Sequence, residues 1–208
     1  MQIDIYSDVV CPWCYIGKRR LDAALSETGM RDVDVRWRAY QPNPDLPPAG
    51  MDRREYMQAK FGPEALTRMH ARLTEAGLSV GIDFKFDRIE RAPNTFNAHR
   101  LLRLAREQLR QEAMAESLFQ AYFIDGRDIG DSAVLAELAA AVGLGDIRAW
   151  LAGDSGSQAV RDELAEAAGL GISGVPFYVF PGRYAVTGAQ SSEVFVRAIN
   201  LAAGESPH

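Results

Sequence analysis

The 208-residue sequence has only two cysteines, Cys11 and Cys14, and three histidines, His70, His99 and His208. So few cysteines exclude a fold that depends on several disulfide bonds, and a chain of this length can bury a core without them. A zinc site needs about four nitrogen or sulfur ligands, and no two of these histidines stand at metal-ligand spacing. We therefore expect no metal site.

Long apolar runs and long basic runs are also missing. No segment reaches the roughly 18 apolar residues that a membrane helix needs, and residues 1–8 lack the pattern of a signal peptide. The net charge is −5, and the longest basic run is Lys18-Arg19-Arg20, of which Arg19 and Arg20 are expected to be solvated surface. The sequence thus argues against membrane and nucleic-acid binding and predicts a cytoplasmic protein. In that reducing compartment, two cysteines are expected to carry out chemistry.

The beginning of the chain alternates between strand and helix patterns. Apolar and polar residues alternate in 2–7, a helical pattern occupies 15–25, and alternation returns in 33–37. This order predicts a βαβ unit. Four prolines within 41–50 indicate a loop and a domain boundary.

The middle of the chain, residues 52–170, has a helical pattern. Apolar residues recur at helical spacing, for example at Ala98, Leu101, Leu102, Ala105 and Leu109. Asn94 and Asp131 are expected helix N-caps. Residues 78–86 interrupt the pattern and predict a loop or a brief hairpin.

The end of the chain returns to strand patterns. Residues 175–180 and 183–187 flank a Pro-Gly turn, which predicts a hairpin, and 190–203 predict a closing helix. Without its helical middle, the chain has the order β, α, β, β, β, α of a thioredoxin-like core. We therefore predict an α/β protein with a thioredoxin-like core in residues 1–50 and 171–208, and an inserted all-helical domain in 51–170.

The strongest chemical signal is the motif Cys11-Pro12-Trp13-Cys14, which follows the first predicted strand and opens the first predicted helix. Unpaired N–H groups and the positive dipole end at a helix N-terminus favour a thiolate. Pro12 suits the first turn because no N–H is lost there. Two intervening residues place the second sulfur one turn inward. We assign Cys11 as the attacking thiol and Cys14 as the resolving thiol.

A second signal is Pro176, which begins a late strand and withholds one hydrogen-bond donor from the sheet. If the Val175–Pro176 bond is cis, the Val175 backbone can pair with an extended substrate. Most X–Pro bonds are trans, so the residues alone leave this open.

These motifs resemble the DsbA-like family of thioredoxin-fold proteins, and most closely its cytoplasmic FrnE-like branch. The matching stretches spread over the whole chain and are residues 7–18, 94–101, 171–177 and 188–190. The resemblance implies an inserted helical domain, a catalytic dithiol at Cys11 and Cys14, and a cis Pro176 facing that dithiol.

Four residues are candidates for contact with a substrate. Pro12 and Val175 adjoin the reacting residues, and Trp13 is either a substrate contact or a lid over Cys14. Trp13 replaces the histidine of the periplasmic relatives, which predicts a weaker oxidant. His99 stands in a pattern that is more typical of a packed residue, but the resemblance implies that its helix faces the dithiol.

The proton relay to the second cysteine is not assigned. Thioredoxin-like proteins often carry a buried acid on the first strand, ahead of the first cysteine. Ile5 stands at that position here, with Asp4 and Asp8 nearby.

Three functions remain open. The leading hypothesis is a thiol–disulfide oxidoreductase that needs no cofactor and exchanges disulfides with proteins or with glutathione. Glutathione-dependent isomerases of 2-hydroxychromene-2-carboxylate and kappa-class glutathione transferases belong to the same superfamily, but they use a serine near the position of Cys11. A non-catalytic binding or chaperone module would have an inaccessible dithiol. The sequence does not decide between a monomer and a homodimer.

Overall fold

The structure, a computed structural model, describes residues 1–204. Residues 205–208, which include His208 and the end of the expected core segment, lie outside the described residues. The sheet that organises the fold has the strand order β2-β1-β5-β6. Its strands are β1 (Gln2–Ser7), β2 (Asp34–Ala39), β5 (Phe177–Phe180) and β6 (Tyr184–Thr187).

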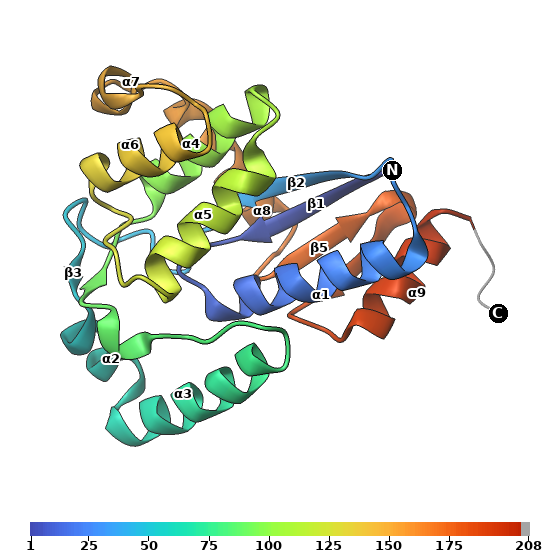
Figure 1. Ribbon diagram of the computed structural model, residues 1–208, viewed down its shortest axis with the longest axis horizontal. Helices are drawn as coiled ribbons and strands as arrows, with labels where there is room; N and C mark the ends of the chain where they lie inside the picture. The colour runs from blue at the N-terminus through green and yellow to red at the C-terminus, as the bar shows by residue number, and fades with distance from the viewer. Residues whose placement is uncertain (205–208) are drawn as a thin grey trace.

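The central strand β1 runs parallel to β2 and antiparallel to β5, and β6 completes a hairpin with β5. Parallel neighbours need a crossover, and α1 (Pro12–Thr28) provides it. α9 (Ser192–Ala202) packs along α1 and against β5 and β6 (Figure 1). Ile3 and Ile5 of β1 are completely buried in the core. The elements therefore follow the order predicted for a thioredoxin-like core.

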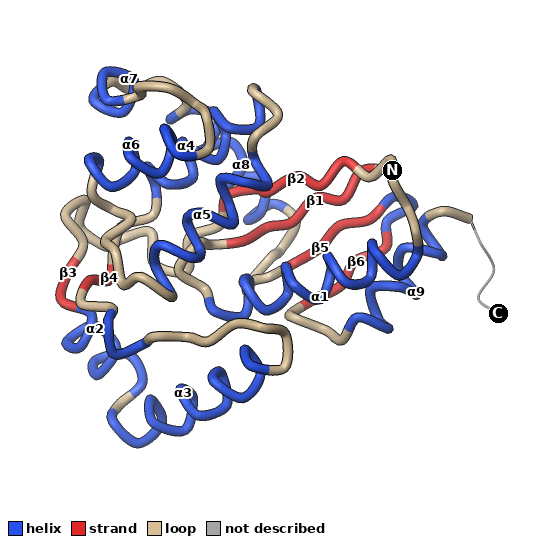
Figure 2. The backbone as a smooth tube through the Cα atoms, viewed as in Figure 1, coloured by secondary structure: helices blue, strands red, loops and turns tan. Residues whose placement is uncertain are grey.

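Helices occupy most of the chain between β2 and β5. They are α2 (Arg53–Phe61), α3 (Pro63–Leu78), α4 (Phe96–Glu107), α5 (Gln111–Phe123), α6 (Ser132–Ala141), α7 (Arg148–Ala152) and α8 (Ser157–Gly169). Short 3₁₀ turns stand at η1 (Phe86–Arg88) and η2 (Pro181–Arg183). Figure 2 shows α2 and α3 lying apart from the group α4–α8. Among residues 1–204, no helix combines the length and the apolar composition that crossing a membrane requires.

Residues 79–85 form a loop, which is one of the two forms expected for the interruption at 78–86. Other local details of the helical middle differ from the sequence-based expectation. Two short strands that the pattern did not predict, β3 (Met51–Asp52) and β4 (Arg91–Ala92), pair with each other. The cap of α4 is Thr95, although the Asn94 side chain accepts a hydrogen bond from the Phe96 backbone N–H at 3.0 Å.

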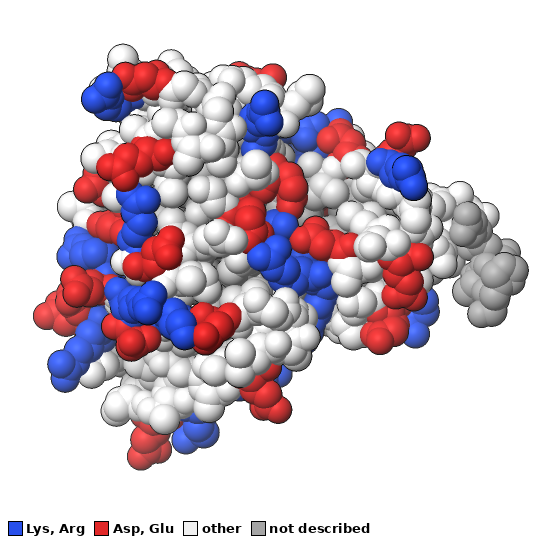
Figure 3. All heavy atoms as spheres, viewed as in Figure 1, with Lys and Arg blue, Asp and Glu red and all other residues white. Residues whose placement is uncertain are grey.

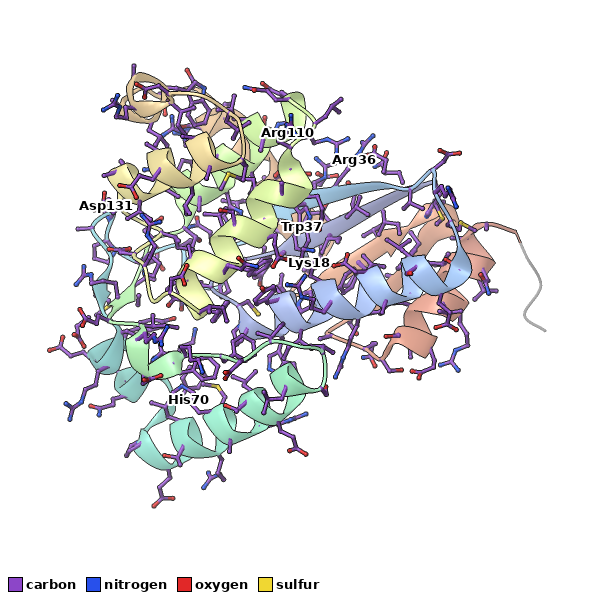
Figure 4. The ribbon with its side chains drawn as sticks, in the orientation of Figure 1. Lys18, Arg36, Trp37, His70, Arg110 and Asp131 are labelled. Atoms are coloured by element: carbon purple, nitrogen blue, oxygen red, sulfur yellow. The ribbon has the colours of Figure 1, made fainter. Side chains whose placement is uncertain are left out.

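A buried ion cluster joins α1 to α5. The side chain of Lys18 is almost completely buried, and its ammonium pairs with Asp22 on α1 and with Glu112 and Glu116 on α5. Burial disfavours the charge on Lys18, but these carboxylates outweigh burial, so the pKa of Lys18 is raised. Figure 4 shows Lys18 at this junction, near Trp37, whose indole N–H donates to Glu112 at 2.8 Å.

The expectation that Arg19 and Arg20 are solvated surface is wrong. Arg19 pairs with Glu116 and donates a hydrogen bond to the Tyr15 hydroxyl at 3.1 Å. Arg20 donates to the backbone carbonyl of Ala189. On the face in Figure 3, basic and acidic side chains are interspersed across the surface.

Candidate active site

The two cysteines lie at the point where β1 leads into α1. The backbone N–H of Cys11 donates to the carbonyl of Asp8 at 3.0 Å, which closes the turn. Cys11 is the N-cap residue of α1, and its own carbonyl accepts the first helical hydrogen bond from Cys14 at 3.0 Å. Both thiols are free. Cys11 is partly exposed, whereas Cys14 has 0 % exposure.

Burial sets the chemistry of Cys14. It raises the pKa of the Cys14 thiol, and the hydrogen bond and charge of the neighbouring Cys11 raise it further. The Ser7 side chain and the Asp8 backbone act in the opposite direction and lower it. Cys14 is therefore held as a protonated thiol while the Cys11 side chain faces the surface.

The loop before β5 lies against the dithiol. The Val175–Pro176 bond is cis, as the resemblance implied. The Cys11 sulfur lies 3.7 Å from the carbonyl oxygen of Val175, which accepts its hydrogen bond. Gly17 of α1 leaves the room that this loop needs, because a Cβ there would lie 3.2 Å from the Pro176 ring and 2.1 Å from the Tyr178 hydroxyl oxygen.

Two separate hollows flank the dithiol. A cavity of about 370 Å³ is bordered by Cys11, Pro12 and Trp13 on one side. A hollow of about 520 Å³ follows the loop 171–177 and includes Val175 and Pro176; we call it the loop groove. The structure thus places Pro12 and Trp13 at the cavity and Val175 at the loop groove.

His99, a candidate for contact with the substrate, lies in the core and not at the wall of either hollow. It is only 3 % exposed. Its Nε2 atom lies 3.5 Å from Oδ1 of Asp8, a carboxylate that is also buried and accepts a hydrogen bond from the Thr95 hydroxyl at 3.2 Å. Asp8 itself borders the cavity. His99 therefore stands behind Asp8, because the α4 face that carries it packs into the core.

A family model described as the DSBA-like thioredoxin domain matches residues 2–200. The chain belongs to this family. A solved structure of a probable DsbA oxidoreductase from Streptomyces coelicolor is 34% identical to this DSBA-like chain, with a TM-score of 0.90 over 100% of this chain and 92% of that one. An uncharacterized protein, YwbO of Bacillus subtilis, is 30% identical over 149 residues, which is 69% of this chain and 67% of that protein.

Two more distant structures share the fold. A 2-hydroxychromene-2-carboxylate isomerase has 17% identity and a TM-score of 0.72, with complete coverage of both chains. The cytosolic disulfide reductase DsbM from Pseudomonas aeruginosa, solved with GSH, has 22% identity and a TM-score of 0.63 over 98% of this chain and 96% of that one. The predicted α/β thioredoxin-like fold with a helical insertion is confirmed.

The cavity also contains residues of the DSBA-like chain that the sequence did not single out. They come from the loop 41–50, from α2 and α3 and from the segment before α4, and include Arg53, Lys60, His70 and Phe86. Helical periodicity places Arg53 and His70 on helices, but it does not say which helix face meets the dithiol. Within residues 1–204, no cluster of His, Cys, Asp and Glu side chains is arranged to hold a metal ion.

Proposed function

We propose that this DSBA-like protein is a thiol–disulfide oxidoreductase of the FrnE-like branch, with Cys11 as the attacking thiol and Cys14 as the resolving thiol. The observation that carries the proposal is the unequal burial of the two sulfurs: one is partly exposed beside the Val175 carbonyl, and the other is completely buried one turn along α1. An exchange reaction needs this order, because the first sulfur must meet the substrate and the second must meet only the first.

The reaction proceeds in two balanced steps. The Cys11 thiolate attacks one sulfur of a substrate disulfide, forms a mixed disulfide and releases the other substrate sulfur as a thiol. The Cys14 thiol then loses its proton and attacks the Cys11 sulfur, which forms the Cys11–Cys14 disulfide and releases the second substrate thiol. Two electrons pass from the protein to the substrate. No cofactor takes part, and an oxidising partner runs the same steps in reverse.

The loop groove suits an extended protein substrate. The Val175 backbone and the cis Pro176 border the groove, and the Val175 carbonyl oxygen lies 3.7 Å from the Cys11 sulfur. Backbone pairing with the Val175 segment of this loop would hold a peptide whatever its side chains. Pro176 is therefore proposed as part of the catalytic site, and Val175 as a contact for the substrate backbone.

Glutathione is the small-thiol partner that we propose. The DsbM structure, which shares this fold, was solved with GSH, and Cys11 is partly exposed. We place the exchange in the cytoplasm, where glutathione is the main thiol. The division into a core of residues 1–50 and 171–208 and an insertion of 51–170 belongs to this proposal. Sedimentation would decide between a monomer and a homodimer.

The two alternatives fit the site less well. An isomerase of the 2-hydroxychromene-2-carboxylate type needs no second thiol, yet Cys14 is present and lies next to Cys11. A binding module without redox chemistry would have both thiols shielded, yet Cys11 is partly exposed.

The deciding experiment is equilibration of the protein with buffers of reduced and oxidised glutathione. We expect a single two-electron transition between a dithiol and a Cys11–Cys14 disulfide, read by mass spectrometry after acid quenching and alkylation. A dithiol that stays reduced in every buffer would leave the binding module as the better hypothesis.

A further inference from the structure

The cavity beside Cys11 has no part in the exchange of protein disulfides described above. It shares no lining residue with the loop groove, although Cys11 borders the one and contacts Val175 of the other. Its volume of about 370 Å³ lies within the range of sites for small molecules, about 300–1,000 Å³.

Most of the cavity wall is apolar. Side chains from the loop 41–50, α2, α3, η1 and α5 close it, including Leu46, Met57, Met69, Leu73, Phe86 and Phe123. Trp13 forms the wall next to the dithiol, and the guanidinium of Arg72 on α3 lies 5.3 Å from its ring centre. These walls suit an aromatic or aliphatic group and offer few partners for a peptide backbone.

The polar groups in the wall favour an anion. Arg53 points to His70, with 3.4 Å between Nη2 and Nε2, and within residues 1–204 it forms no ion pair with a carboxylate. Burial, and then the charge of Arg53, lowers the pKa of His70, so His70 is neutral at neutral pH. Figure 4 shows His70 at α3, and its ring stacks on Phe86 at 4.5 Å.

A second cation stands at the same wall. Lys60 donates to Asn43 at 3.0 Å and to the Tyr56 hydroxyl at 2.9 Å, and in the described part of the chain it too has no carboxylate partner. The one carboxylate in the wall, Asp8, is already engaged by Thr95. In a chain with a net charge of −5, this cavity thus carries two cations against one carboxylate.

We propose that the cavity binds a low-molecular-weight disulfide that has an aromatic or similarly apolar body and a carboxylate, and that it presents the disulfide to Cys11. This inference rests on the proposed function. The apolar body fills the space between Trp13 and Phe86, and the carboxylate meets the guanidinium of Arg53, whose planar fork matches it.

The chemistry is the exchange given above, with both substrate halves small. Cys11 forms the mixed disulfide with one half and releases the other as a thiol, and Cys14 then releases the first half. One substrate disulfide therefore yields two thiols and one Cys11–Cys14 disulfide. A dithiol reductant such as dithiothreitol returns the protein to its starting state.

The test compares two chromogenic aromatic disulfides, the anionic dithiobis(nitrobenzoate) and the neutral dithiodipyridine, each reacting with the reduced full-length protein. Each rate is divided by the rate with free reduced glutathione, which removes the intrinsic reactivity of the probe.

Arg53→Met should lower the anionic-to-neutral rate ratio about tenfold, as expected for loss of a hydrogen-bonded charge pair. Arg53→Lys should restore part of that ratio. The matched control Arg54→Met changes an exposed arginine of the same helix outside the cavity wall and should leave the ratio unchanged.

A second variant tests the space. Met57→Trp fills the cavity and should slow both aromatic probes relative to hydroxyethyl disulfide, which is small enough to reach Cys11 from outside. Circular dichroism and the unfolding midpoint show whether each variant is folded. If Met57→Trp does not fold, the Arg53 variants alone test the proposal.

The outcomes separate this inference from the proposed function. If the protein exchanges with glutathione disulfide but Arg53→Met and Arg54→Met have the same anionic-to-neutral ratio, the cavity proposal is overturned and the oxidoreductase stands. If Cys11 reacts with none of the disulfides, both fail.

Discussion

The sulfur of Cys11 and the carbonyl oxygen of Val175 lie 3.7 Å apart, although 164 positions separate the two residues in sequence. This contact brings the first helix and the last hairpin to one point. A substrate bound along Val175 would therefore lie beside the attacking sulfur without any movement of the fold.

The unequal burial of the two thiols gives the first prediction. In the reduced native protein, iodoacetamide should label Cys11 rapidly and leave Cys14 unlabelled, because Cys14 is completely buried and its pKa is raised. Mass spectrometry of the digested protein after brief treatment reads the sites. Labelling in denaturant, where both should react, is the control, and equal labelling in the native state would contradict the assigned roles.

The second prediction concerns the order of attack. Cys14→Ser should accumulate mixed disulfides with glutathione or with protein substrates, because the first step survives and the second does not. Cys11→Ser should accumulate none. Non-reducing gels and intact mass measurements read the adducts, with the double variant as the background. Equal trapping by both single variants would remove the ordered mechanism.

The close approach of α1 to the loop before β5 gives the third prediction. Gly17→Ala should destabilise the protein by about 1–3 kcal/mol and slow disulfide exchange, because the added methyl group meets the Tyr178 hydroxyl and the Pro176 ring. Urea unfolding and the exchange rate with glutathione disulfide measure the two effects. Gly169→Ala on α8 is the matched control, because a Cβ there has no neighbour within 4 Å. A Gly17→Ala protein as stable as this control would show that α1 and the loop are not held in contact.

The fourth prediction follows from the ion cluster between α1 and α5. Burial alone would raise the pKa of Glu116, but the Tyr15 hydrogen bond and the charges of Lys18 and Arg19 outweigh it and lower the pKa below its usual 4.5. Because the pKa of Glu116 is lower in the folded state, Glu116 contributes to the free energy of unfolding above pH 4.5. This contribution is lost as the pH falls through the pKa that Glu116 has in the folded protein.

Glu116→Gln should therefore cost about 2 kcal/mol at neutral pH, as expected for a hydrogen-bonded charge, and the cost should shrink as the pH falls below 4.5. Urea unfolding of both proteins at a series of pH values measures this difference. Glu107→Gln, which changes an exposed carboxylate at the end of α4, is the control. A cost that stays constant across the pH range would mean that Glu116 acts through packing and not through its charge.

The sequence predicted those parts of the site that depend on short-range order. The strand before Cys11, the helix that starts at Pro12 and the hairpin after Pro176 each leave a local pattern, so they could be placed before the structure was known. The cavity could not be predicted, because Arg53 and His70 reach it only through the packing of α2 and α3.

Three other features of the structure have similar physical causes. Arg19 was expected at the surface because its partner Glu116 comes 97 residues later, on a helix whose position no local pattern reveals. The strands β3 and β4 have two residues each, which is too short for an alternation pattern to show. His99 was placed correctly on a helix, but the choice of the buried face depends on how α4 packs.

The position of one sulfur between two hollows also has a kinetic consequence. Cys11 borders the cavity and contacts the loop groove through Val175, so a molecule reacting from one side occupies the only sulfur available to the other. A carboxylate-bearing disulfide and a protein thiol would then alternate at Cys11 and never form a ternary complex. Initial-rate plots against one substrate at several fixed levels of the other would give parallel lines, with each substrate inhibiting competitively when it is in excess.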